Sequence, residues 1–186
     1  MNEECLLIID MQKGLDDVSF GKRNNYCLEE NVALLLSKFR EAKLPVIHVK
    51  HTSLEEKSPL RKGLIGNEYK SEAVPLENEM QFEKTVNSAF IGTNLEDYLK
   101  EKEIRTLIIV GMTTDHCIST TVRMASNLGF NIKLVSDATA TFDRKSYDGV
   151  LYEAEEIHKI NLLSLNGEFC RIFETKEILK NTKSDK

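Results

Sequence analysis

The sequence predicts a single domain of three-layer α/β/α architecture, with a mostly parallel sheet of about six strands between two layers of helices. Short apolar runs, typical of strands buried on both faces, alternate along the chain with segments of helical periodicity. Most connections between these segments are short. This favours parallel strands joined by helices that pack on both faces of the sheet.

The first half of the chain predicts two strands, a helix between them and a long loop. Residues 5–10 form an apolar run, residues 29–42 place their apolar side chains at helical spacing, and residues 44–49 form a second apolar run. Residues 52–75 lack clear periodicity and carry two prolines and two glycines, so we expect a long loop. A loop of this length in a compact domain is usually functional.

The second half continues the alternation of strands and helices. The expected elements are, in order, a short extended piece at 82–86, a helix at 94–103, a strand at 106–110, a helix at 116–128, a strand at 131–135, a helix at 146–163, a strand at 169–173 and a short last helix. Asn94 is a suitable N-cap for its helix. Gly129 is a typical C-terminal residue for the helix before it.

Composition limits the class of protein. The 186 residues are 41% hydrophobic, which suffices for one core, and we expect one domain over 1–180 with a frayed tail at 181–186. The net charge of -5 and the lack of a basic run argue against nucleic acid or an anionic membrane as partner. No apolar stretch reaches transmembrane length, and the acidic N-terminus is unlike a signal peptide, so we expect a cytoplasmic protein.

The four cysteines lie far apart, form no metal-type pair and are expected to be reduced thiols. They are Cys5, Cys27, Cys117 and Cys170. Cys117 alone has an activating context, because it follows the strand at 106–110 and begins the helix at 116–128. Open α/β sheets place ligand sites at that edge. A helix N-terminus stabilises negative charge, so we expect a lowered thiol pKa and a nucleophilic thiolate.

Other polar residues also lie at predicted strand ends. Asp10 ends the first strand, and no helical pattern follows that it could cap, which favours a functional role. Lys84 taken alone is expected to be a solvated surface lysine, since lysines are rarely buried unless paired. A functional role for it depends on Asp10 and Cys117. His48 and His51 flank the end of the second strand, and we expect them to line a pocket or to act structurally. Asp137 is expected to organise the edge of the site by hydrogen bonding to backbone amides.

Several motifs, taken in order, resemble the isochorismatase-like cysteine hydrolase superfamily, which includes nicotinamidases and N-carbamoylsarcosine amidases. They are Leu-Ile-Ile-Asp-Met-Gln at 7–12, Lys84 followed by Asn-Ser-Ala-Phe at 87–90, the segment 111–121 and Asp-Ala-Thr-Ala-Thr at 137–141. The stretches 58–61 and 165–169 are similar as well. The resemblance covers nearly the whole chain and implies the same three-layer fold.

The resemblance implies a set of catalytic residues. Asp10, Lys84 and Cys117 would form a triad, in which Asp10 acts as base and acid, Lys84 stabilises charge and Cys117 is the nucleophile. The peptide bond between Met112 and Thr113 would be cis. The backbone N–H groups of Thr113 and Cys117 would form the oxyanion hole.

The expected substrate contacts are Gln12, Phe90 and His116. Neighbours on a helix point about 100° apart, so His116 is expected to form a wall of the site and not to act as the base for Cys117. Metal-binding nicotinamidases carry an Asp and several His residues after the second strand. Residues 46–53 lack that cluster, so we predict no catalytic metal and no cofactor.

The predicted function is hydrolysis of a small-molecule amide or another C–N bond through a thioester on Cys117. One alternative is a vinyl-ether hydrolase of the isochorismatase type, in which Asp10 protonates the substrate and the thiol is incidental. A catalytically silent binding protein and a thiol redox role are further alternatives. The resemblance also implies a homo-oligomer, either a dimer or a tetramer. The substrate itself cannot be predicted.

Overall fold

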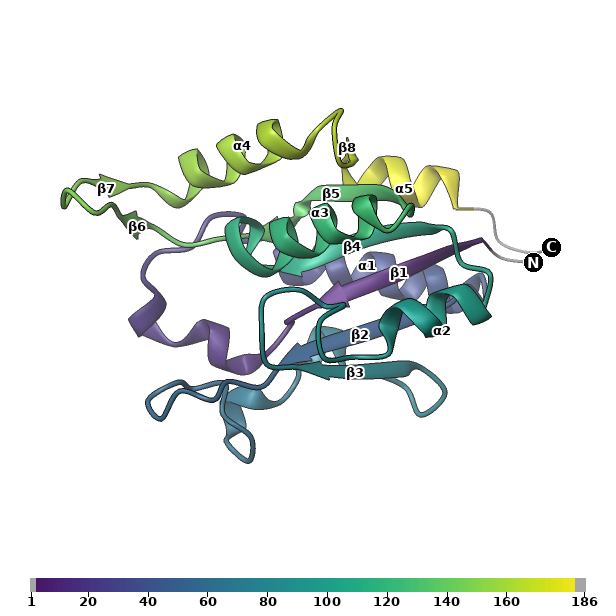
Figure 1. Cartoon of the computed structure of the whole chain (residues 1–186), viewed down its shortest axis with the longest axis horizontal. Helices are drawn as coiled ribbons and strands as arrows, with labels where there is room; N and C mark the ends of the chain where they lie inside the picture. Colours follow the sequence, from purple (N-terminus) through teal and green to yellow (C-terminus); the bar gives the residue numbers. More distant parts are fainter. Residues whose placement is uncertain (1–2, 183–186) are drawn as a thin grey trace.

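The computed structural model describes residues 3–182, and its centre is a sheet of six parallel strands in the order β3-β2-β1-β4-β5-β8 (Figure 1). The strands are β1 (Glu4–Ile9), β2 (Val46–His51), β3 (Met80–Lys84), β4 (Thr106–Met112), β5 (Asn131–Ala140) and β8 (Arg171–Phe173). The helices are α1 (Leu28–Glu41), α2 (Leu95–Glu101), α3 (Ser119–Asn127), α4 (Ala154–Leu165) and α5 (Thr175–Asn181). This arrangement confirms the predicted fold class.

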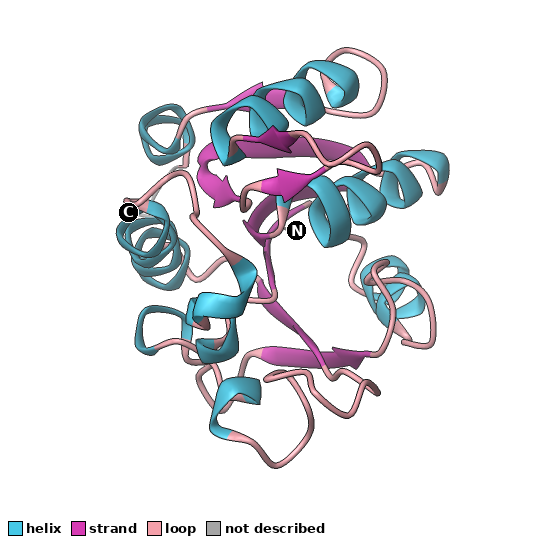
Figure 2. Ribbon diagram, turned by 90° about the vertical axis from the view of Figure 1, so that its left-hand side faces the viewer, coloured by secondary structure: helices cyan, strands magenta, loops and turns pink. Residues whose placement is uncertain are grey.

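Helices cover both faces of the sheet, as Figure 2 shows, and alternate side chains of β1 enter two separate cores. Leu6 and Ile8 pack with α1 and α5 on one face. Leu7 and Ile9 pack with α2, α3 and α4 on the other face. Successive side chains of a strand point to opposite faces, so an unbroken apolar run is what a central strand between two helical layers requires.

One predicted helix begins too early. The segment 146–153 is not helical but belongs largely to a short antiparallel hairpin, β6 (Arg144–Lys145) with β7 (Leu151–Tyr152), and α4 begins only at Ala154. The hairpin projects from the end of α4 in Figure 1. Asp148 accepts hydrogen bonds from the Ser146 hydroxyl and the Val150 N–H, and Gly149 adopts a positive φ of 90°. Turn chemistry of this kind overrides the helical spacing of the apolar residues.

The carboxyl ends of β1 and β4 have unusual backbone conformations. Asp10 follows β1 with φ at 52°, a left-handed conformation that is uncommon for a residue with a side chain. Gly111 in β4 has φ at 119°, and a Cβ atom there would lie 1.9 Å from the Ile9 carbonyl oxygen. Only glycine fits this close approach of the two strands. The two positions set the direction in which the chain leaves the sheet edge.

Candidate active site

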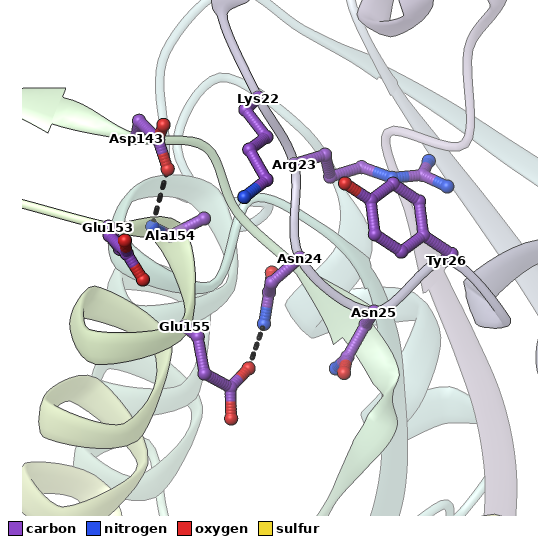
Figure 3. Close-up of a pocket in the computed structure, with 9 residues that line it drawn as sticks. All are labelled: Lys22, Arg23, Asn24, Asn25, Tyr26, Asp143, Glu153, Ala154 and Glu155. Carbon is purple, nitrogen blue, oxygen red and sulfur yellow. Dashed lines mark hydrogen bonds between the residues drawn. The ribbon is translucent and has the colours of Figure 1, made fainter.

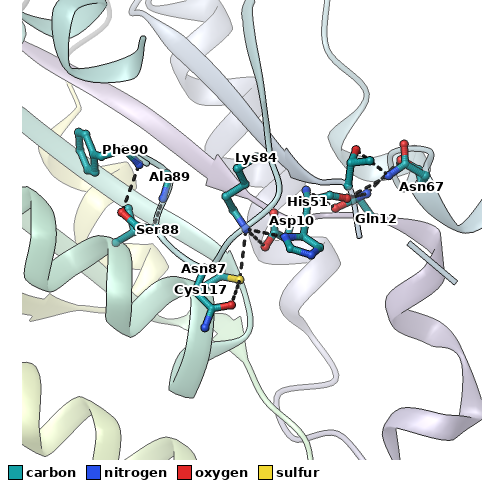
Figure 4. Close-up of polar contacts among 12 residues, drawn as sticks. Asp10, Gln12, His51, Asn67, Lys84, Asn87, Ser88, Ala89, Phe90 and Cys117 are labelled. Atoms are coloured by element: carbon teal, nitrogen blue, oxygen red, sulfur yellow. Dashed lines mark hydrogen bonds and ion pairs between the residues drawn. The ribbon is translucent and has the colours of Figure 1, made fainter. Parts of the chain in front are cut away.

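Asp10, Lys84 and Cys117 meet at the carboxyl edge of the sheet (Figure 4). The Lys84 ammonium donates to Asp10 Oδ2 at 2.7 Å and lies 3.2 Å from Cys117 Sγ. Asp10 directly follows β1, Lys84 is the last residue of β3, and Cys117 lies in the turn after β4. Parallel strands bring their carboxyl ends to one edge, so three segments distant in sequence supply one site.

The sequence predicts that Cys117 lies in the first turn of an α-helix, and this prediction is wrong. The residue belongs to a π-helical turn, Thr114–Ile118, which comes before α3. The peptide bond between Met112 and Thr113, just ahead of this turn, is cis. The Thr113 carbonyl accepts hydrogen bonds from both His116 N–H and Ile118 N–H. Both hydrogen bonds of this turn therefore end on the Thr113 carbonyl, and the backbone N–H groups of His116 and Ile118 already have an acceptor.

The predicted lowering of the Cys117 pKa is wrong for the protein without substrate. Burial raises the pKa of this thiol above its ordinary value, and the Asp10 carboxylate raises it further, while the Lys84 ammonium lowers it only in part. Burial also disfavours the Lys84 ammonium, but the neighbouring Asp10 and Cys117 outweigh burial and raise the pKa of Lys84. The resting cluster is therefore a neutral thiol beside an ion pair.

Asp10 keeps one oxygen available for chemistry. Its Oδ2 accepts from Lys84, whereas Oδ1 is buried and has no hydrogen-bond partner. A buried acceptor without a donor is costly, and native structures rarely leave one without reason. The Cys117 thiol interacts with this carboxylate and also lies 3.8 Å from Asn87 Oδ1. The free oxygen is suited to receive a proton from the thiol.

A cavity of about 280 Å³ opens beside the cluster. One part of its wall is apolar, from Leu15, Phe20, Leu60 and Met112. The remaining lining is polar or belongs to the cluster and its turn: Asp10, His51, Ser53, Glu55, Ser58, Asn87, Thr113, His116, Cys117 and Arg144. Such a mixture of apolar walls and a few polar groups is typical of a small-molecule site. His116 is thus a wall residue, as expected.

Gln12 and Phe90, the other two expected substrate contacts, do not line this cavity. Gln12 is fully buried, and its amide is hydrogen-bonded to the backbone of His51 and to the Asn67 carbonyl. Phe90 is buried in the core and stacks on Phe130 with the ring centroids 6.0 Å apart. Both lie close in sequence to catalytic candidates, but their side chains point into the protein.

Asp137 does not organise the edge of the site either. Its Oδ1 accepts hydrogen bonds from the backbone N–H and the hydroxyl of Thr175, at the start of α5. The reason is that β5 does not end at this residue but continues to Ala140. The carboxylate therefore fixes a helix terminus away from the cavity.

Several lining residues were absent from the predicted site or left without a definite role, among them His51, Asn87 and Arg144. His51 ends β2, and its position at a strand end was visible in the sequence. Asn87 follows Lys84 by three residues, in the motif that carries the resemblance. The sequence gives no sign of a role for Arg144, because the residues of its hairpin were predicted to form a loop and the start of a helix. Arg144 donates to Asp115 at 2.9 Å, and Asp115 lies two residues before Cys117.

A second cavity, of about 210 Å³, lies beside the start of α4 (Figure 3). Its lining groups bind one another: Asn24 donates to Glu155 at 3.1 Å, and the Ala154 N–H donates to Asp143 at 2.7 Å. These bonds fasten the loop at 22–26 and the segment after β5 to the N-terminus of α4. None of its lining side chains has a buried polar atom without a partner.

Within residues 3–182, no group of three or more His, Cys, Asp or Glu side chains could hold a metal ion. No helix in this part of the chain has both the length and the apolar character that crossing a membrane requires. The cysteines described here are all free thiols.

The parallel sheet, with a cavity of apolar and polar side chains at its carboxyl edge, defines a three-layer α/β protein with a candidate small-molecule site. The family model of the isochorismatase domain matches residues 4–161, and the chain therefore belongs to the isochorismatase family of hydrolases. The isochorismatase family protein YrdC of Bacillus subtilis (strain 168) is 43% identical over 96% of this chain and 96% of its own length.

Two further comparisons extend this result. A solved isochorismatase-family protein from Chromobacterium violaceum has a TM-score of 0.93 and 40% identity, covering 97% of this chain and 93% of the other. Nicotinamidase 3 of Arabidopsis thaliana is 27% identical over 95% of this chain and 87% of its own length. The family and the hydrolase fold are thus established over nearly the whole sequence.

Proposed function

We propose that the protein hydrolyses a small-molecule amide, or another C–N bond, through a thioester on Cys117. One observation carries this proposal. The Lys84 ammonium contacts both Asp10 and Cys117 inside a buried cluster, while Asp10 Oδ1 has no partner. A nucleophile, a base and a fixed positive charge are the groups that covalent hydrolysis of an amide needs.

In the first step, Cys117 Sγ attacks the carbonyl carbon and its proton moves to Asp10. The new S–C bond turns the carbonyl oxygen into an oxyanion. Proton transfer within the cluster keeps the total charge of the three side chains and the bound substrate unchanged. Release of the proton to solvent would instead leave an excess negative charge in a buried site, which is costly. The raised thiol pKa is therefore compatible with a nucleophile that ionises only as it reacts.

We assign the oxyanion to the backbone N–H groups of Thr113 and Cys117. Both residues line the cavity, and the neighbouring amides of His116 and Ile118 already donate to the Thr113 carbonyl. Removing one donor from an oxyanion hole typically costs about 3 kcal/mol of transition-state stabilisation.

The rest of the cycle uses Asp10 twice. The C–N bond breaks as Asp10 gives its proton to the leaving amine, which departs and leaves a thioester. Asp10 then takes a proton from a water molecule, whose oxygen attacks the thioester carbonyl. The C–S bond breaks, the thiol regains its proton, and a carboxylic acid is released.

The amide is favoured over the vinyl ether because of the cysteine. An ether hydrolase that works by protonating its substrate needs Asp10 but has no use for a thiol held 3.2 Å from a buried ammonium. A relative whose name is nicotinamidase also supports an amide substrate. A silent binding protein would gain nothing from an orphaned carboxylate oxygen in its pocket.

The test is turnover of a panel of small primary amides and carbamoyl compounds, followed by release of ammonia, for the natural protein and for Cys117→Ala. We expect a loss of about 10⁴-fold or more in kcat, as is typical when a nucleophile is removed. Cys27→Ala, which removes an exposed thiol, is the matched control and should be active. Undiminished turnover by Cys117→Ala would rule out the thioester, and retained ether cleavage would favour the alternative.

The homo-oligomer stays a prediction from the resemblance to the family. Sedimentation equilibrium of the purified protein measures it directly. A mass of two or four chains is expected, and a single chain at micromolar concentration would contradict it.

A further inference from the structure

The Lys84 ammonium has three N–H donors and three acceptors around it (Figure 4). Two acceptors are Asp10 Oδ2 and Cys117 Sγ, which take part in the proposed chemistry. The third is the imidazole Nδ1 of His51, 3.5 Å from Nζ. Lys84 is 1% exposed, so water cannot replace a missing acceptor easily. The third partner is therefore needed to keep the ammonium satisfied.

The backbone of His51 is held more firmly than strand pairing requires. His51 is the register partner of Lys84 in the β2–β3 pair. Its N–H donates to Gln12 Oε1 at 2.8 Å, and its carbonyl accepts from Gln12 Nε2 and Asn67 Nδ2, each at 2.9 Å. Two buried side-chain amides thus bind one residue. Gln12, expected to contact the substrate, instead fixes the residue that contacts Lys84.

The electrostatic surroundings keep the imidazole neutral. Burial lowers the pKa of His51, and the Lys84 charge lowers it further. The carboxylates of Asp10 and Glu55 and a hydrogen bond to the Val86 backbone act in the opposite direction but do not compensate. A neutral ring has one nitrogen free to accept, whereas a protonated ring has none and would place a second positive charge beside the ammonium.

We propose that His51 is a positioning residue, whose neutral imidazole accepts at Nδ1 the ammonium N–H that Asp10 and Cys117 leave unused. It thereby holds Lys84 between the base and the nucleophile. This inference rests on the proposed function for its effect on turnover, but the contact itself does not. Without the acceptor, Nζ shifts toward Asp10 and away from Cys117, and the buried ammonium is destabilised.

Two substitutions separate this role from simple packing. His51→Asn places an amide oxygen close to the position of Nδ1 and cannot titrate, whereas His51→Leu fills the space without an acceptor. A hydrogen bond to a charged group is worth about 10- to 100-fold, so we expect kcat to fall by that factor in His51→Leu with little change in KM. His51→Asn should retain most of the kcat of the natural protein. Its pH profile should lack the fall in activity at acid pH that protonation of His51 causes.

His48→Asn is the matched control, because His48 lies in the same strand but binds Glu79 and not Lys84. It should lower the thermal midpoint without altering the shape of the pH profile. The proposal is overturned if His51→Leu keeps kcat within about threefold of the natural protein. It is also overturned if His51→Asn and His51→Leu lose activity equally while both fold.

A nitrogen NMR measurement on the natural protein tests the contact without any substrate. At neutral pH we expect His51 to have an unprotonated Nδ1 that accepts a hydrogen bond and a protonated Nε2, with the signal assigned by its loss in His51→Asn. A proton on Nδ1 would refute the proposal. If Cys117→Ala retained hydrolysis, the proposed function would fail, and this spectrum would still decide whether His51 binds Lys84.

Discussion

Two buried carboxylates at opposite ends of the β2–β3 pair have opposite environments. Glu79 directly precedes β3, and its two oxygens accept four hydrogen bonds: two from Arg40, one from His48 and one from the Leu76 N–H. Asp10 lies at the other end of the pair, beside the last residue of β3. It accepts one bond from Lys84 and leaves Oδ1 without a partner.

The difference separates a structural carboxylate from a reactive one. Burial alone would raise the pKa of Glu79, but the Arg40 guanidinium, the Leu76 amide and His48 lower it to about 2. A carboxylate bound in this way stays ionised and links the loop before β3 to α1 and β2. The open oxygen of Asp10 is free to take up and return a proton. The number of donors, more than burial, therefore decides which carboxylate can act as a base.

Of the substitutions that test the difference between Asp10 and Glu79, Asp10→Asn should have the largest effect on activity. Without the base, kcat should fall by about 10²- to 10⁴-fold. The thiol should become easier to ionise, because Asp10 raises the Cys117 pKa and Lys84 remains to lower it. Alkylation by iodoacetamide, measured against pH at Cys117, should show a lower midpoint than in the natural protein. A midpoint that rises or stays unchanged would contradict this account of the cluster.

Lys84→Met should act on the same thiol in the opposite direction. The lost ammonium raises the Cys117 pKa, so alkylation should slow at every pH below the new midpoint. Asp10 is left as a buried charge without its partner, which typically costs about 3 kcal/mol or more of folding free energy. Urea denaturation measures that loss. Adding Asp10→Asn should recover part of the stability, and a double variant less stable than Lys84→Met would count against the ion pair.

Glu79→Gln should affect stability and leave the chemistry intact. The folded-state pKa of Glu79 is about 2, below its ordinary value of 4.5. The carboxylate therefore stabilises the folded protein fully above pH 4.5, and this contribution is lost as the pH falls toward 2. We expect a loss of about 3 kcal/mol at neutral pH. The difference in the free energy of unfolding between the natural protein and Glu79→Gln should disappear as the pH falls across that range, while kcat is unchanged. A difference that does not depend on pH would contradict the assignment.

Arg144→Gln should produce the smallest change. Arg144 binds Asp115 through Nε and Nη2, and Nη1 has no protein partner within residues 3–182, so it can donate to a substrate in the cavity. We expect KM to rise by about 3- to 10-fold with a smaller change in kcat, the loss typical of one hydrogen bond. Steady-state kinetics on the preferred amide measure both. A fall in kcat alone would instead place Arg144 in support of the turn at Cys117.

The fold and two of the three central residues, Asp10 and Cys117, could be predicted from local pattern. Unbroken apolar runs specify buried parallel strands; Asp10 ends such a run, and Cys117 lies in the segment that follows another. Lys84 carried no local signal and was identified through the resemblance alone. The hairpin at 144–152 was missed because a turn of Ser146, Asp148 and Gly149 outweighs an apparently helical spacing.

The direction of individual side chains could not be predicted. Gln12 and Phe90 lie next to functional segments, yet they point away from the cavity, and a position in sequence does not fix the face a side chain occupies. The thiol pKa was mispredicted for a similar reason. A helix terminus lowers a thiol pKa from within one element, whereas the burial and the Asp10 charge that raise the Cys117 pKa come from the rest of the fold. The Glu79 cluster joins residues that are 31 and 39 positions apart, which no local pattern reveals.

The most direct test of the central claim is to trap the acyl group. The protein, with Cys27 replaced by Ser to remove the exposed thiol, is mixed with p-nitrophenyl acetate, quenched in acid during turnover and mapped by mass spectrometry. The account predicts a rapid burst of p-nitrophenolate and an acetyl thioester on the peptide that carries Cys117, with its hydrolysis slowed in Asp10→Asn. Continued turnover with Cys117 unmodified at every quench time would contradict it.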